Sequence, residues 1–139
     1  MQRAFWKSLL LAAVVAVGGC DNDPDQTPTE PAPTVTETFT GTVAVNGASP
    51  HTFPVVAAGT VTATLTEITP DNTVAVGFAL GTWNASSSIC QQVITNDNAT
   101  QGQILTGNAS GPGTLCVRLS DPGSKLTASA GYTVTVVHP

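Results

Sequence analysis

The clearest pattern in the chain is a strict alternation of apolar and polar residues in short runs. In the segment 59–67, GTVTATLTE, residues Val61, Ala63 and Leu65 lie on one face and the threonines lie on the other. The run 132–136, YTVTV, alternates in the same way. A period of two is typical of a β-strand with one buried face. These two runs therefore predict strands of a sheet that packs on a hydrophobic core.

Six further runs have the composition of short strands. In one of them Leu115, Val117 and Leu119 share a face, which sends Cys116 and Arg118 to the opposite face. The other five runs are at 39–45, 52–56, 74–80, 89–95 and 103–106. Turn-forming residues separate the runs, at 46–47, 69–72, 96–98, 110–113 and 121–123. Eight short strands without helical periodicity predict an all-β protein, a single antiparallel β-sandwich of jelly-roll type over residues 36–139.

Two segments with a different composition precede the predicted sandwich. Residues 1–19 contain Arg3 and Lys7, then an apolar run at 9–17 and two glycines. A membrane-spanning helix needs roughly 18–20 apolar residues, so this shorter run predicts a cleaved signal peptide. Residues 20–35 are rich in proline, threonine and aspartate and have little to bury, which predicts a disordered linker.

The residues 17–20, VGGC, resemble the lipobox of bacterial lipoproteins, in which an aliphatic residue and two small residues precede a cysteine. The resemblance implies cleavage before Cys20, diacylglycerol on its sulfur and an acyl chain such as palmitate on its amine. A plain secretory signal that leaves Cys20 as an accidental neighbour is the alternative, and we favour the lipoprotein interpretation. The expected location is the bacterial cell envelope, on the periplasmic or the surface face of a membrane.

The cysteine count supports a disulfide. With lipid on Cys20, an even pair remains, Cys90 and Cys116, in a compartment outside the cytoplasm where disulfides persist. Two buried free thiols are one alternative, and a shared metal site is another that no histidine spacing supports. We favour a Cys90–Cys116 disulfide.

Charge and motifs exclude several classes of function. Without residues 1–19 the chain keeps Arg118 and Lys125 against nine acidic residues, a net charge of −7, which argues against binding to nucleic acid. His51 and His138 are isolated, and no nucleophile motif accompanies them. We therefore expect no catalytic residues and no enzymatic activity.

A few residues are candidates for ligand binding. Trp83 would stack on a sugar ring if exposed, but packing against the protein is the favoured interpretation. Asp71, Asn72 and Asp97 would offer oxygen ligands to calcium if their loops met. Local hydrogen bonding in turns explains these residues better, so we expect no metal and no cofactor. The threonines at 60, 62, 64 and 66 form either a recognition surface or an ordinary solvent-facing side, and the second is favoured.

Four pieces of the domain resemble the bacterial pre-peptidase C-terminal domain: 51–68, 73–80, 113–121 and 131–137. The resemblance implies a jelly-roll-like, non-catalytic accessory domain of secreted hydrolases that binds calcium in some members. The chain departs from that family because no peptidase precedes the domain. The acidic cluster that often follows the third strand is also reduced here to Asp71 and Asn72.

These patterns together predict a membrane-anchored lipoprotein that presents a β-sandwich for binding or adhesion, with a polysaccharide or another envelope protein as ligand. A structural or assembly subunit of an envelope complex is the alternative. The patterns do not predict the number of subunits.

Overall fold

A computed structural model of the chain describes residues 30–139, of which 31–139 form one compact unit. The predicted signal peptide, the predicted lipid attachment at Cys20 and most of the predicted linker lie outside the described residues. In the described part we found no helix long and apolar enough to cross a membrane.

The described residues form eight strands, which confirms the all-β prediction. Strands such as β3 and β8 arise where apolar and polar residues alternate, because one face of the strand is buried and the other is more exposed. β4 differs, since its first six residues are all buried. The strands are β1 (Val35–Val43), β2 (Ala48–Val55), β3 (Gly59–Thr69), β4 (Val76–Asn84), β5 (Ile89–Ala99), β6 (Ile104–Ala109), β7 (Gly113–Ser120) and β8 (Ala130–His138).

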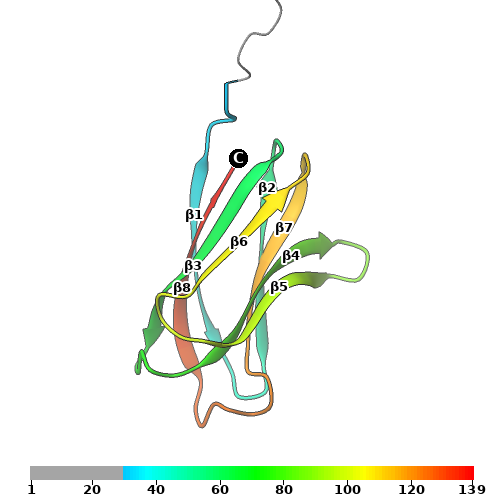
Figure 1. Cartoon of the computed structure of the whole chain (residues 1–139). Coiled ribbons are helices and arrows are strands. Elements are labelled where there is room, and N and C mark those ends of the chain that lie inside the picture. Colours follow the sequence, from blue (N-terminus) through cyan, green and yellow to red (C-terminus); the bar gives the residue numbers. More distant parts are fainter. Residues whose placement is uncertain (1–29) are drawn as a thin grey trace, which may run out of the picture. The chain divides into compact units, whose positions relative to one another are not determined.

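The strands form two antiparallel sheets that pack face to face as a sandwich (Figure 1). The first sheet has the order β1-β8-β3-β6, and the second has the order β2-β7-β4-β5. The chain therefore changes sheet at every connection except the β4–β5 hairpin. This arrangement of eight strands in two interleaved sheets is the jelly roll that the sequence predicts.

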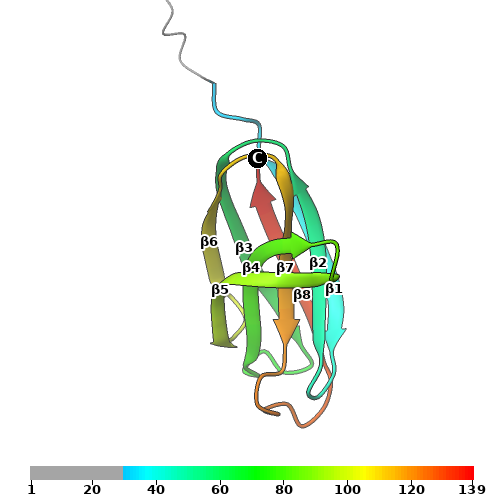
Figure 2. The same cartoon turned by 90° about the vertical axis from the view of Figure 1, so that its right-hand side faces the viewer.

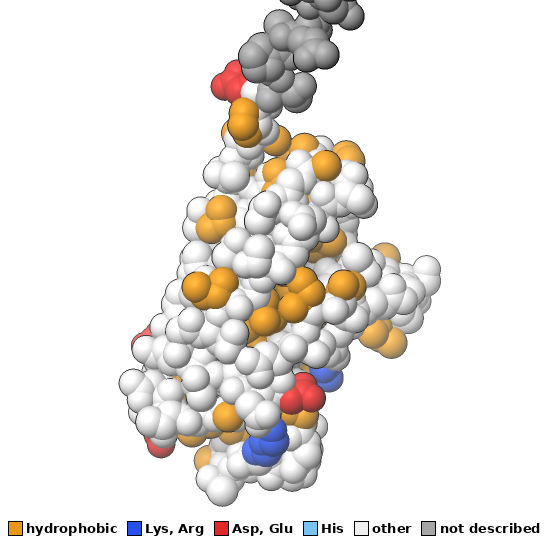
Figure 3. Space-filling view, viewed as in Figure 1, with side chains coloured by type: hydrophobic (Ala, Val, Ile, Leu, Met, Phe, Trp, Pro, Cys, Tyr) orange, Lys and Arg blue, Asp and Glu red, His pale blue; other side chains and the backbone are white. Residues whose placement is uncertain are grey.

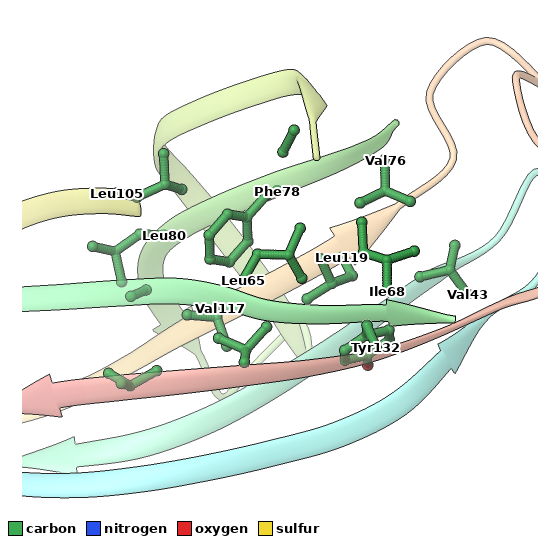
Figure 4. Close-up of a cluster of buried hydrophobic side chains, with 14 of the residues drawn as sticks. Val43, Leu65, Ile68, Val76, Phe78, Leu80, Leu105, Val117, Leu119 and Tyr132 are labelled. Atoms are coloured by element: carbon green, nitrogen blue, oxygen red, sulfur yellow. The ribbon is translucent and has the colours of Figure 1, made fainter. Parts of the chain in front are cut away.

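The core lies between the two sheets. Side chains such as Leu65 and Val134 of the first sheet meet Phe78, Val117 and Leu119 of the second, and each of them is at most 1% exposed. Figure 4 shows how side chains from both sheets point toward one another. Leu115, Val117 and Leu119 lie on the core side of β7, and Cys116 lies on its outer side, as the alternation predicts.

One predicted turn is wrong. Residues 96–98, Asn-Asp-Asn, lie inside β5, and the chain turns instead at Gly102, which has a φ of 92°. The pairing of β4 with β5 shifts here, so that two residues of β5 oppose Gly77 alone. The Asn96 side chain accepts a hydrogen bond from the backbone of Asn98 at 2.9 Å. The local polar bonding that usually closes a turn therefore makes a β-bulge.

β4 and β5 extend past the sandwich as a two-stranded arm, residues 81–92, which turns across the outer face of the second sheet (Figure 2). The turn begins at a second shift in the β4–β5 pairing, between Leu80 and Gly81. A Cβ atom on Gly81 would lie 2.0 Å from the carbonyl oxygen of Gln91. Only glycine admits this close approach of two backbones, so Gly81 permits the arm to fold.

We predict that Gly81→Ala destabilises the domain by about 1–3 kcal/mol, because the added Cβ meets backbone atoms that cannot rotate away. Urea denaturation followed by tryptophan fluorescence measures the change. Gly113→Ala is the matched control, since a Cβ on Gly113 meets nothing within 4 Å. Equal stability of the two variants would contradict the role of Gly81.

Candidate functional site

The predicted disulfide is confirmed. Cys90 of β5 and Cys116 of β7 are bonded, with their Cα atoms 5.8 Å apart and a sequence separation of 26. A loop of this length stabilises a fold by roughly 3–4 kcal/mol in the chain-entropy description. Because the bond joins the arm to β7, it also holds the arm against the outer face of the second sheet.

The predicted strand at 74–80 would place Trp83 after its end. In the structure β4 continues to Asn84, so Trp83 lies within the strand. It pairs with Cys90 on the arm and is half-buried. It is not among the residues of the central core. The sequence missed this position because the arm prolongs β4 beyond the part that the sandwich buries, where the apolar alternation ends.

The other predicted ligand-binding residues lie at the opposite end of β4, roughly 20 Å from Trp83 at about 3.3 Å per residue. Asp71 and Asn72 line an open polar hollow with Glu67 and Gln101. Asp71 accepts hydrogen bonds from the backbone and the hydroxyl of Thr73, which lower the pKa of its carboxyl group. Its carboxylate therefore serves a local turn.

Asp97 does not join Asp71 in a ligand set. The backbone carbonyl of Asp97 and the side chain of Asn98 both accept hydrogen bonds from the Lys125 ammonium group, at 2.9 and 2.5 Å. Among residues 30–139, no three His, Cys, Asp or Glu side chains are grouped so that they could hold a metal ion.

An apolar hollow that the sequence did not predict opens on the side of the sandwich where β5 and β6 form the two edges. Its volume is about 80 Å³, and its lining comes from both sheets: Val61, Leu80, Gly81, Thr82, Val93, Ile94, Gly107, Asn108 and Leu115. Figure 3 shows hydrophobic atoms gathered there, in a depression between β6 and the arm. We call this site the apolar hollow.

Two glycines make room for the apolar hollow. Gly81 lets the arm turn away from β6, which separates the two edges. A Cβ on Gly107 of β6 would lie 3.0 Å from Cδ1 of Ile94 and 3.4 Å from Cδ2 of Leu80, so this glycine leaves space above two core side chains. Val93, at the rim, is 71% exposed. Sequence periodicity could not indicate the hollow. The hollow exists because two edge strands from different sheets lie apart, and periodicity within one strand does not report that distance.

The opposite open side, between β1 and β2, is filled by a row of aromatic and polar side chains. Phe39 stacks on His51 with ring centroids 5.0 Å apart, and Phe53 packs on His138 at the same distance. His138 is 2% exposed, and its Nε2 lies 3.1 Å from Oε1 of Glu37. One side of the sandwich is thus closed by this histidine row, while the other remains open.

A hydrogen-bonded chain runs through the histidine row. The Tyr132 hydroxyl donates to Oγ of Ser49 at 2.7 Å and lies 2.7 Å from Nε2 of His51. Nε2 of His51 donates to the tyrosine oxygen in the tautomer that carries its hydrogen on that nitrogen. Burial lowers the pKa of His51 and raises the pKa of Tyr132. Ser49 accepts a hydrogen bond from the tyrosine, which links β2 to β8 across this side of the sandwich.

A buried carboxylate fastens two loops at one end of the sandwich. Asp121 accepts hydrogen bonds from the backbone amides of Asn46, Lys125 and Leu126, at 2.9, 2.8 and 3.2 Å. These bonds, with that of Asn46 foremost, lower the pKa of Asp121. The predicted turn at Asn46 and Gly47 is confirmed, and Asp121 holds it against the β7–β8 loop.

A scan of the chain against models of known protein families found no match, and a search of curated proteins found no relative. The resemblances to the lipobox and to the pre-peptidase C-terminal domain therefore stay predictions from the residues quoted above.

We predict that the free energy of unfolding falls as the pH is lowered from 7 to 5. The unfolded chain binds a proton at His51 near the usual pKa of about 6.5, whereas the folded chain binds it only at lower pH. The lowered pKa values of Asp71 and Asp121 extend the loss of stability below pH 4. Denaturant titrations at each pH measure this. In His51→Gln, which keeps a donor to Tyr132, the slope between pH 7 and 5 should be shallower, and an unchanged slope would contradict the assignment.

Proposed function

We propose that this protein is a lipid-anchored lipoprotein of the bacterial cell envelope, and that its jelly roll is a non-catalytic module that binds another envelope protein. Two separate arguments support the two halves of the proposal. The lipobox-like residues that end in Cys20 support the anchor, and the apolar hollow supports the binding module.

The apolar hollow is the observation that carries the binding role. Its floor includes the core side chain Leu80, and the half-buried Ile94 and the exposed Val93 also line it. Exposed apolar sites with a polar rim mark places where proteins bind other molecules. The hollow has room for about one apolar side chain, and Thr82 and Asn108 at its margin offer hydrogen-bonding groups.

The lining favours a protein ligand over a polysaccharide. Sugar rings are commonly held by stacking on aromatic side chains, and the lining of this hollow contains none. Trp83 is half-buried on the arm and is not part of the lining. β6 is an edge strand whose six residues, ILTGNA, include neither a charge nor a proline. An edge of this kind can pair with the backbone of an extended partner segment.

We predict that Cys20→Ser abolishes attachment of lipid and leaves the signal peptide uncleaved by the lipoprotein pathway. Metabolic labelling with an alkyne fatty acid measures the first effect, and the mass of the purified protein measures the second. Asp21→Asn, which keeps the cysteine, should still be labelled and should float with the membranes. Labelling of Cys20→Ser at the level of the unaltered protein would refute the lipid anchor.

We predict that a photo-crosslinking residue, p-benzoylphenylalanine, captures a protein partner in intact cells when it replaces Val93 at the rim of the hollow. Val56 is the matched control, since it is 68% exposed on a different part of the domain. Gly107→Val, which fills the hollow from β6, should remove the Val93 adduct while the thermal transition of the domain persists. Equal crosslinking at both positions, or none at position 93, would refute the proposed site.

A further inference from the structure

The outer face of the first sheet is covered by threonine. On β1, β8, β3 and β6 the residues that alternate with the core positions are almost all threonines. We call this surface the threonine face, and it consists of Thr36, Thr38, Thr40 and Thr42 of β1, Thr133 and Thr135 of β8, Thr60, Thr62, Thr64 and Thr66 of β3, and Thr106 of β6. The sequence indicated only the set on β3.

The pairing of the strands places these threonines in rows across the sheet. Thr38 pairs with Thr135, which pairs in turn with Thr64 on its other side. In the neighbouring row Thr62 pairs with Thr106. Thr40 pairs with Thr133 in the row on the other side. Directly opposed residues share a face of the sheet, so the rows form a two-dimensional array of threonines, which Val137, Ile104 and Asn108 interrupt.

The threonine face has an unusual chemical character, because each position offers one methyl group and one hydroxyl group. Its one charged side chain is Glu67, which pairs with Thr133 after the pairing shift in β3 and accepts a hydrogen bond from the Thr133 hydroxyl group at 3.2 Å. Threonine is stiff at χ1, so an array of threonines loses little side-chain entropy when a ligand fixes it. Thr38 on the edge strand is exposed, whereas Thr64 and Thr135 in the middle are held between their neighbours.

This character excludes most partners. An anionic ligand finds no positive charge on the face, and a cationic ligand finds only Glu67, which Thr133 already engages. A sugar ring finds no aromatic side chain to stack on. A second protein surface, including another copy of this chain, would bury many hydroxyl groups without partners, at a cost for each one. The remaining class is a regular, neutral lattice of water that accommodates methyl groups and hydrogen-bonds to hydroxyl groups.

The spacing of the array fits such a lattice. Neighbouring strands lie about 4.7–4.9 Å apart, and alternate residues along a strand repeat about every 6.6–6.8 Å. These two repeats are close to the spacings of the oxygen atoms on a prism face of hexagonal ice. We propose that the threonine face binds the surface of ice crystals. Since sheets twist by roughly 20–25° per strand, the match is best along adjacent columns, such as those of β1, β8 and β3.

The test uses the chain from residue 20 to 139 with Cys20→Ser, which keeps the protein free of lipid, and measures ice recrystallisation and thermal hysteresis. The unsubstituted face should slow recrystallisation and shape ice crystals. Thr135→Arg in the middle of the array and Thr38→Arg on the exposed edge should each abolish both effects. Thr38→Arg covers the case in which the central substitution disturbs folding, and thermal melting verifies the fold of each variant.

Thr114→Arg is the matched control. Thr114 is exposed on the outer side of β7, in the other sheet, and its substitution should leave ice binding intact. Three results would overturn the proposal: no effect of the parent protein on ice, full activity in Thr38→Arg and Thr135→Arg, or an equal loss of activity in Thr114→Arg.

Discussion

The shape of the domain depends on the contact between two backbones at Gly81. The carbonyl group of Gln91 lies where any larger residue would place its Cβ, so β5 can cross β4 closely and the arm can turn over the second sheet. The Cys90–Cys116 bond then fixes the arm to β7. Because the arm leaves the line of the sandwich, β5 does not close against β6, and the core remains accessible there. Gly81 and the disulfide thus set the position of the arm, and Gly107 leaves the space that completes the apolar hollow.

The two open sides of the sandwich differ in whether side chains cover the core between the edge strands. Each side ends in edge strands from different sheets, and core side chains would meet water between them. Between β1 and β2, Phe39 and His51 stack across the gap, and Tyr132 joins them by hydrogen bonds. Between β5 and β6 the residues at the gap are aliphatic or glycine, apart from Thr82 and Asn108, and the gap stays open. The difference favours the open side as the place where a ligand binds.

Sequence patterns predicted the parts of this structure that depend on local alternation. Eight strands, the sandwich and the pairing of Cys90 with Cys116 follow from side-chain periodicity and from the cysteine count. The prediction of a turn at 96–98 was wrong, because Asn and Asp side chains form the same local hydrogen bonds in a β-bulge as in a turn. The hollow and the rows of the threonine face were not predictable, since both require the order and register of strands that are distant in sequence. For example, β8 pairs with β1 on one side and with β3 on the other, and this places Thr135 between Thr38 and Thr64.

The first residue of β1, Val35, pairs with His138 at the end of β8. Any chain that tethers the domain from its N-terminal side therefore pulls on β1, an edge strand with a single hydrogen-bonded neighbour. The Glu37–His138 pair and the Phe39–His51 stack lie near the first residues of β1, where such a force would act. The histidine row thus has a mechanical consequence: it resists peeling of β1, the strand on which such a tether would pull.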